Sequence, residues 1–232
     1  MKKRATSPTD CGPRCYVYKV IVDSGGAPCV YRNLLSLAIC KPAIRRTAKV
    51  GDLVFGFGGN NEQIPNRLVY IAEITEKSTG GDYYYEPRFA KRPDCIYRWT
   101  AGDELVLKDD AKFHQHADAR PRDVGRYSRY GNASVLLSKD FRYFGASATD
   151  DWKRSYPTIT KLVEGMGQGH RVNHGPRLSE ELLELKAEMW QTYAKVKLGE
   201  PVHGRKKQDC HSAPCDEDEC VEVTKTGCER VC

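Results

Sequence analysis

The chain has 232 residues, with 37 Lys and Arg against 31 Asp and Glu, which gives a formal net charge of +6. Because domains usually contain about 100 to 200 residues, this length predicts one main domain with appendages. No apolar run approaches the roughly 18 residues of a membrane span, and the basic N-terminus has no apolar segment behind it. We therefore expect no membrane partner, no secretory signal and a cytoplasmic protein.

Composition divides the chain into three parts. We predict a disordered lead-in at 1–14, the main domain at 15–200 and a Cys-rich, acidic, disordered tail at 201–232. Residues 205–232 hold five Lys and Arg and seven Asp and Glu, a net charge of −2, so the rest of the chain carries +8. A basic body suits a polyanionic partner, because neutralising phosphates releases counterions; ordinary solubility charge is the alternative.

Half of the ten cysteines lie in the last 23 residues: Cys210, Cys215, Cys220, Cys228 and Cys232. Their spacing does not match the close pairs of zinc ribbons or knuckles. We therefore predict no bound metal and no cofactor, with zinc in the tail as the alternative.

The expected elements of the first half begin with an alternating strand at 15–23. A short helix is expected at 31–40, with its leucines inward and Pro42 at its end. Strands at 51–59 and 67–77 then form a hairpin or a neighbouring pair.

In the second half, short strands are expected at 95–99 and 102–108, a long basic loop at 113–133, a strand at 134–145 and a short helix within 151–172. Apolar residues at three- and four-residue spacing predict a helix over 178–199, capped by Ser179. The fold class is therefore α+β, with a mixed, partly barrel-like sheet and flanking helices.

A cluster of cations stands directly before the strand at 51–59: Lys41, Arg45, Arg46 and Lys49. Loops between strands can direct such side chains at phosphate oxygens. In an extended chain Arg45 and Arg46 point to opposite sides, so one is expected to bind a ligand while the other pairs with an acid or an aromatic ring. A solvated basic turn is the alternative.

A second feature interleaves aromatic residues with cations: Tyr83, Tyr84, Tyr85, Arg88, Phe89, Lys91 and Arg92. This mixture suits an unstacked base and its phosphate backbone. Three consecutive tyrosines cannot all face a core from one strand, so at least one is expected to be exposed. Half-buried tyrosines with wet hydroxyl groups are the alternative.

The basic loop at 113–133 contains His114 and His116, which share a face if the chain is extended. No third ligand stands at a recognisable spacing, so a hydrogen bond to a ligand is favoured over a metal. Four arginines continue the basic character: Arg120, Arg122, Arg126 and Arg129. No phosphate-binding loop, dinucleotide fingerprint, zinc-protease motif or nucleophile elbow occurs in the chain.

Three blocks, CKPAIRRTAKVGDLVFGFGG, RLVYIAEITEKSTGGDYYYEPRFAKRP and LLSKDFRYFG, resemble the second type of nucleotide modification associated domain. The resemblance spans roughly residues 15–175. It implies a bacterial or phage protein found beside systems that modify DNA bases, with other DNA-modification proteins as possible partners. The second and third strands also resemble the EVE and PUA-like barrels, whose members bind RNA or modified bases. That resemblance implies a pocket near Arg45, Arg46, Tyr84, Tyr85 and the loop at 114–126.

The leading hypothesis is a protein that binds DNA or a nucleotide and recognises a modified or flipped base. Lys41, Arg45, Arg46, Arg92 and Arg126 would contact phosphate, Tyr84 and Tyr85 would stack, and Asp82 or His114 would read a base edge. The rival is an enzyme that modifies a nucleotide or base, with catalytic groups from His114, His116, Asp118, Asp123 and Tyr127. A third class is a defence protein that acts through protein contacts.

Overall fold

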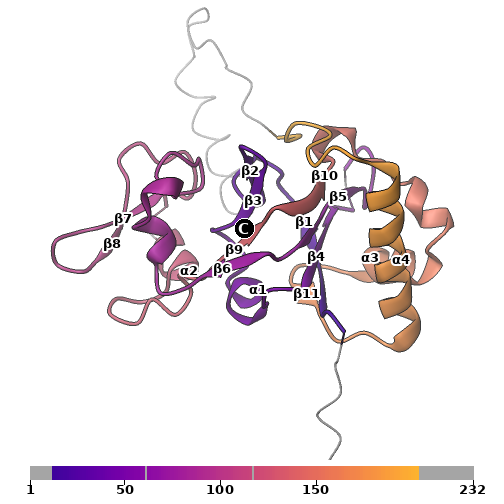
Figure 1. The fold of residues 1–232 in the computed structure, drawn as a ribbon, viewed down its shortest axis with the longest axis horizontal. Coiled ribbons are helices and arrows are strands. Elements are labelled where there is room, and N and C mark those ends of the chain that lie inside the picture. Colours follow the sequence, from indigo (N-terminus) through magenta and orange to yellow (C-terminus); the bar gives the residue numbers. More distant parts are fainter. Residues whose placement is uncertain (1–11, 61, 117, 204–232) are drawn as a thin grey trace, which may run out of the picture.

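The computed structural model describes residues 12–60, 62–116 and 118–203 (Figure 1). Most of the predicted lead-in and most of the predicted tail, including all five tail cysteines, lie outside the described residues.

The described strands form three sheets. The central sheet has the order β10-β5-β4-β1-β11, in which β1 and β4 are parallel and the other neighbours are antiparallel. Its strands are β1 (Cys15–Val20), β4 (Leu53–Gly58), β5 (Leu68–Glu73), β10 (Asp140–Tyr143) and β11 (His170–Arg171). A second, antiparallel sheet contains β2 (Cys29–Tyr31), β3 (Leu34–Leu37), β9 (Val135–Ser138) and β6 (Glu76–Ser78), and β7 (Tyr97–Trp99) pairs with β8 (Leu105–Leu107).

The helices are short apart from the last one. The α-helices are α1 (Pro42–Thr47), α2 (Ala119–Asp123), α3 (Pro157–Gly165) and α4 (Pro176–Thr192). The 3₁₀ turns are η1 (Asp82–Tyr84), η2 (Pro87–Phe89), η3 (Gly145–Ser147) and η4 (Asp151–Arg154). In the part of the chain that the structure describes, no helix combines the length and the apolar composition that crossing a bilayer requires.

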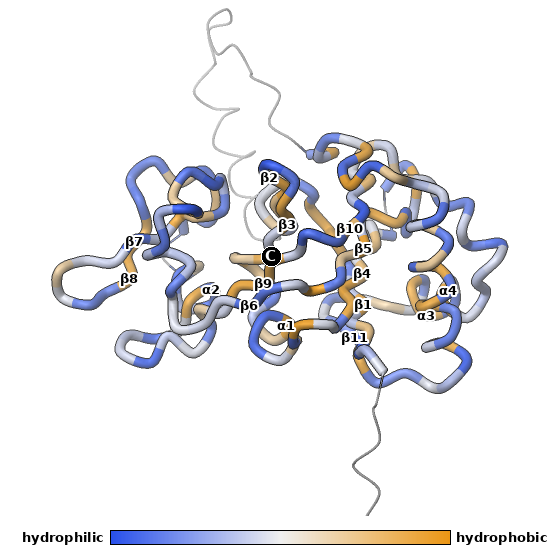
Figure 2. Tube along the Cα trace, viewed as in Figure 1, coloured by the Kyte–Doolittle hydropathy of each residue, from blue (hydrophilic) through white to orange (hydrophobic). Residues whose placement is uncertain are grey.

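The core is layered around the central sheet. One apolar cluster lies between this sheet and the α3–α4 pair, and a second lies between it and the β2-β3-β9-β6 sheet. A third cluster joins the second sheet to the segment of η1, η2, β7 and β8, at the opposite end of the molecule from α3 and α4 (Figure 1). Apolar residues follow the central strands, whereas the outer loops are largely hydrophilic (Figure 2).

The α+β class is confirmed, and strands occur within the predicted segments at 15–23, 51–59 and 67–77. The helix predicted at 31–40 is wrong. This segment is the β2–β3 hairpin, which turns at Arg32 and Asn33 with φ angles of 49° and 57°. Positive φ at both central residues matches the twist of a two-residue hairpin. Pro42 begins α1 instead of ending a helix, which suits its fixed φ angle.

Of three further predictions, one is unconfirmed and two differ from the structure. None of the described sheets closes on itself, so the barrel-like part of the fold prediction is unconfirmed. The loop expected at 113–133 contains α2. The last helix begins at Pro176 and ends at Thr192, so Ser179 lies inside its first turn and does not cap it.

A buried carboxylate joins the last two long helices. Glu181 on α4 is fully buried and accepts hydrogen bonds from the backbone N–H groups of Thr158 (2.8 Å) and Ile159 (3.0 Å) at the start of α3. Burial alone would raise the pKa of Glu181, but these hydrogen bonds, with the nearby charge of Arg177, lower it below its usual value. The carboxylate therefore stabilises the helix pair in its ionised form.

We predict that Glu181→Gln lowers the free energy of unfolding at pH 7 by about 1–3 kcal/mol, because charged hydrogen bonds are replaced by neutral ones. The folded-state pKa is depressed, so this contribution is present above the unfolded value of about 4.3 and disappears as the pH falls through the folded value. Urea unfolding at pH 7 and pH 3 measures it. Glu180→Gln, at an exposed neighbouring position, is the control; an equal loss in both variants, or the same loss at both pH values, would contradict the assignment.

Candidate functional site

A thiol, an imidazole and a carboxylate meet where β3 runs into α1. The Sγ atom of Cys40 lies 3.2 Å from Nε2 of His114, and Nδ1 of the same ring is paired with Oδ2 of Asp123. An ionised carboxylate only accepts hydrogen bonds, so Nδ1–H donates to Asp123, and in the neutral imidazole Nε2 is then the acceptor that faces the thiol. The three groups form a Cys–His–Asp chain with the atom order of a nucleophile, a base and an orienting acid.

The backbone conformation is unusual at two of the three residues, Cys40 and His114. Cys40 and the following Lys41 have φ angles of 57° and 44°, and His114 has a φ angle of 53°. Non-glycine residues rarely adopt this left-handed conformation, and such residues concentrate at functional sites. Among the described cysteines, Cys40 is the partly exposed one, whereas Cys15, Cys29 and Cys95 are buried. Cys40 is therefore the least buried of the described cysteines.

Further donors hold the carboxylate of Asp123 in place. The backbone N–H of Cys40 donates to Oδ1 at 2.9 Å, and the hydroxyl of Tyr97 donates to Oδ2 at 2.8 Å. Burial raises the pKa of Tyr97 well above its usual value, and the charge of Asp123 raises it further, so this hydroxyl remains a donor. Tyr84 packs edge-on against Tyr97, with ring centroids 5.5 Å apart.

The side chain of Arg45 holds the two ends of the site together. It is fully buried, and its guanidinium group donates to the carbonyl oxygens of Cys40 (2.6 Å) and Asp123 (2.6 Å). It also donates to the carbonyls of Asn132 (2.6 Å) and Ser134 (2.7 Å). The chain between these acceptors reverses at Gly125, where φ is 93° and an added Cβ would lie 2.8 Å from the amide nitrogen of Gly131.

The arrangement suits nucleophilic chemistry better than metal binding. The imidazole stands between the thiol and the carboxylate and uses both nitrogens for them, so the three groups do not converge on a common point. In the described part of the chain, no group of three or more His, Cys, Asp or Glu side chains is placed to hold a metal ion. Removing the thiol proton through Nε2 would give a thiolate beside an imidazolium that Asp123 stabilises.

The cations predicted to contact phosphate separate into interior and surface residues. Arg45 and Arg92 are buried, and the guanidinium of Arg92 is taken up by Tyr83, Asp94 and backbone carbonyls of the second sheet. We reassign both to the scaffold, because their donors already have partners. Arg46 and Arg126 are exposed, and Lys41 lies over the ring of Tyr18 with its Nζ atom 5.0 Å from the centroid.

The residues predicted to stack on a base or read its edge also divide into buried and exposed residues. Tyr84 is buried and donates to the carbonyl of Ala38, two residues before Cys40, at 3.1 Å, so it acts in the scaffold of the site. Tyr85 is 79% exposed, and Asp82 lies on the surface beside it. His114 belongs to the Cys–His–Asp chain.

The rival set of catalytic residues is divided as well. His114 and Asp123 meet at the site, whereas His116 is exposed, Asp118 forms an exposed ion pair with Arg122, and Tyr127 is 58% exposed. Sequence reasoning missed Cys40. The available signal was a Cys-Lys-Pro step between a strand and a basic turn, but nothing in it distinguishes Cys40 from nine other cysteines.

A family model described as nucleotide modification associated domain 2 matches residues 12–208. The chain belongs to this family. No curated protein and no solved structure matches the chain, so the resemblance to EVE and PUA-like barrels is unconfirmed. The family description associates the domain with nucleotide modification, and the Cys–His–Asp chain lies within the matched residues.

We predict that Arg45→Met lowers the free energy of unfolding by about 3 kcal/mol, because it leaves the four carbonyl groups around the guanidinium, two of them in buried hydrogen bonds, without their donor. Arg46→Met, one residue along on the exposed side of α1, should change it by less than about 0.5 kcal/mol. Urea unfolding of the two variants measures the difference, and similar losses would show that Arg45 is not the structural tie described above.

A second prediction concerns the reactivity of Cys40. At pH 7.5, iodoacetamide should label Cys40 at least about tenfold faster than Cys15, Cys29 or Cys95, because the thiolate is the reacting species. Burial raises the pKa of Cys15 to about 11 and raises those of Cys29 and Cys95 as well. Peptide mass spectrometry reports each rate separately.

His114→Asn should slow the labelling of Cys40 by about tenfold through loss of the base, and His116→Asn should leave the rate unchanged. Equal labelling of Cys40 in both variants would show that His114 does not activate the thiol.

Proposed function

We propose that this domain is an enzyme that modifies a nucleotide or a DNA base through a covalent step at Cys40. His114 acts as the general base, and Asp123 orients the imidazole and stabilises its charged form. The observation that carries the proposal is the 3.2 Å approach of Cys40 Sγ to His114 Nε2, with Asp123 bound to the other ring nitrogen. The family's association with nucleotide modification supports a nucleotide as the substrate class.

The hydrogen bonds of the site favour one kind of electrophile. In acyl transfer, the backbone N–H of the nucleophile commonly helps to stabilise the oxyanion. Here the N–H of Cys40 is committed to Asp123 at 2.9 Å. Attack on an electron-poor ring carbon makes no demand on that donor, because the displaced π electrons move onto the ring's own carbonyl or nitrogen. A nucleobase is therefore a better substrate than a peptide or an ester.

Surface residues near Asp123 suit the rest of a nucleotide. Arg126 and Tyr127 follow α2 within four residues of Asp123, and both are exposed. Arg46 is exposed on α1, which begins two residues after Cys40. We assign phosphate contacts to Arg46, Arg126 and Lys41, and stacking to Tyr127 or Tyr85, as parts of this proposal.

A second candidate is a protein that binds a modified base without altering it. Its specific support is the exposure of two tyrosines, Tyr85 and Tyr127, each of which lies within three residues of an exposed arginine in the chain. Exposed aromatic rings next to cations are typical of platforms for unstacked bases. This candidate requires shape, stacking and donors, but it assigns no role to the thiol.

The test detects covalent modification of Cys40 in the full chain. The protein is incubated with each deoxynucleoside monophosphate and with single-stranded DNA. Mass spectrometry of the acid-quenched protein then detects a covalent adduct, and mass spectrometry of the nucleosides detects a product. We expect an adduct or product that Cys40→Ser and His114→Asn reduce at least about a hundredfold, and that His116→Asn leaves unchanged.

Binding measured in parallel separates the two candidates. Retained binding with lost chemistry in Cys40→Ser supports the enzyme. Equal binding by wild type and Cys40→Ser, with neither adduct nor product from any of these nucleotides, would favour the binding protein.

A further inference from the structure

A compact loop, residues 125–131, is closed at the guanidinium group of Arg45. This group donates to the carbonyl oxygens of Asp123 and Asn132, which flank the loop, at 2.6 Å each. It also donates to the carbonyl of Cys40 at 2.6 Å. Loops whose two ends lie close together are compact surface units that frequently carry function. The base of this loop is therefore fixed beside the backbone of Cys40.

The exposed side chains of the loop include two cations. Arg126 and Arg129 are exposed, and neither guanidinium has a hydrogen-bond or ion-pair partner within the described residues. The arginines just before the loop differ, since Arg120 and Arg122 are each paired with a carboxylate. No acidic residue lies within 124–131. The loop therefore presents two positive charges that remain available to an anionic ligand.

An aromatic ring stands between these cations in the chain. Tyr127 is 58% exposed and packs edge-on against Tyr130, with ring centroids 6.3 Å apart. Tyr130 is itself buried, packs edge-on against Trp99 at 5.3 Å, and accepts a hydrogen bond from the backbone N–H of Leu105 at 3.0 Å. The exposed ring thus rests on an anchored one. An exposed aromatic ring beside unpaired cations is what an unstacked base and its phosphates require.

Strand β7 relates this aromatic stack to the proposed reaction centre. Tyr97 and Trp99 are alternate residues of the strand, so they share a face and lie about 6.6 Å apart along it. The hydroxyl of Tyr97 donates to Asp123 of the Cys–His–Asp chain, whereas Trp99 packs against Tyr130. The reaction centre and the stack therefore contact neighbouring same-face positions of one strand. Adjacent nucleotides of an unstacked single strand can cover such a distance.

We infer that the loop at 125–131 is a platform for the nucleotide next to the reacting one, so that the substrate of this site is a single-stranded nucleic acid instead of a free nucleotide. This inference rests on the proposed function. The base of the neighbouring nucleotide stacks on Tyr127, and its phosphates contact Arg126 and Arg129. A base-paired strand cannot use the platform, because its bases are already stacked on each other.

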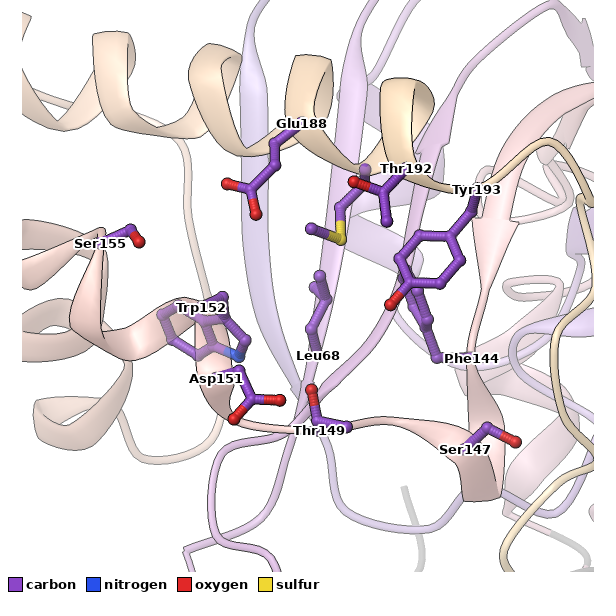
Figure 3. Close-up of a pocket in the computed structure, with 11 residues that line it drawn as sticks. Leu68, Phe144, Ser147, Thr149, Asp151, Trp152, Ser155, Glu188, Thr192 and Tyr193 are labelled. Carbon is purple, nitrogen blue, oxygen red and sulfur yellow. The ribbon is translucent and has the colours of Figure 1, made fainter.

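A cavity of about 290 Å³ between η4 and the last turns of α4 is less suited to nucleic acid. Figure 3 shows Asp151 and Glu188 among its lining side chains, on these two different elements. Two carboxylates disfavour a phosphate backbone, whereas the exposed charges of the loop at 125–131 are both positive. Charge therefore favours the loop over this cavity as the place where the strand binds.

Fluorescence anisotropy with labelled oligonucleotides of about ten nucleotides tests the platform. The full-length Cys40→Ser variant is used, because it cannot form the adduct. The probes are a mixed-sequence single strand, as DNA and as RNA, and the matching DNA duplex. We expect at least one single strand to bind about tenfold more tightly than the duplex, because only an unstacked base can lie on Tyr127. The DNA and RNA probes show which sugar the platform accepts.

Substitutions in the loop separate stacking from charge. Tyr127→Ala should weaken the binding of the single strand about tenfold, and Tyr127→Phe should keep it, because the ring does the stacking. Arg129→Gln should reduce the slope of log K against log salt by about 0.7, the effect of one lost phosphate contact. Arg154→Gln, a matched change at an exposed position on η4, should leave the slope unchanged. Equal binding of single strand and duplex, or binding that is insensitive to Tyr127→Ala, would overturn the inference.

Adduct formation by the wild-type chain distinguishes this inference from the proposed function. We expect the single strand to form the Cys40 adduct at least about tenfold faster than a mononucleotide, and Tyr127→Ala to remove that advantage. An adduct that forms equally fast from the mononucleotide would support the enzyme and overturn the platform. Binding that depends on Tyr127, without an adduct from any probe, would support the platform and reject the covalent step.

Discussion

The buried guanidinium of Arg45 donates to backbone carbonyls from separate parts of the chain: those of Cys40, Asp123, Asn132 and Ser134. Removing a cation from water costs several kcal/mol, and the carbonyl oxygens offset that cost only while all of them point at the same group. The loop before α1, the end of α2 and the entry to β9 are therefore fixed together. A shift in any one of them would leave a buried charge underpaired.

The negatively charged carboxylate of Asp123 is a second centre of hydrogen bonds at the site. It accepts from the backbone of Cys40, the hydroxyl of Tyr97 and the ring of His114. Arg45 thus fixes the backbone on both sides of the site, and Asp123 fixes the side chains within it. An arrangement held by so many buried hydrogen bonds is preorganised, which is what a base and a nucleophile need to stay in contact without substrate.

The sequence predicts secondary structure correctly where the hydrophobic pattern fits only a strand or only a helix. It misleads where the pattern fits both. Alternating apolar residues predict β1, β4 and β5, but Leu34, Leu35 and Leu37 fit both a helix and a strand. The turn at Arg32 and Asn33 lacks the glycine that usually marks a two-residue hairpin. The site depends on contacts between residues 74 and 83 positions apart in the chain, which no local pattern encodes. Adjacent arginines were expected to face opposite ways; Arg45 lies inside and Arg46 outside, through a helical turn instead of an extended chain.

Strand β4 contributes side chains to the apolar layers on both faces of the central sheet. Phe55 and Phe57 point into the layer below α3 and α4, where Phe57 meets Trp152 with ring centroids 4.9 Å apart. Val54 points the other way, into the layer shared with the second sheet. Because successive side chains leave a strand on opposite faces, this one strand ties the layer under α3 and α4 to the layer between the two sheets.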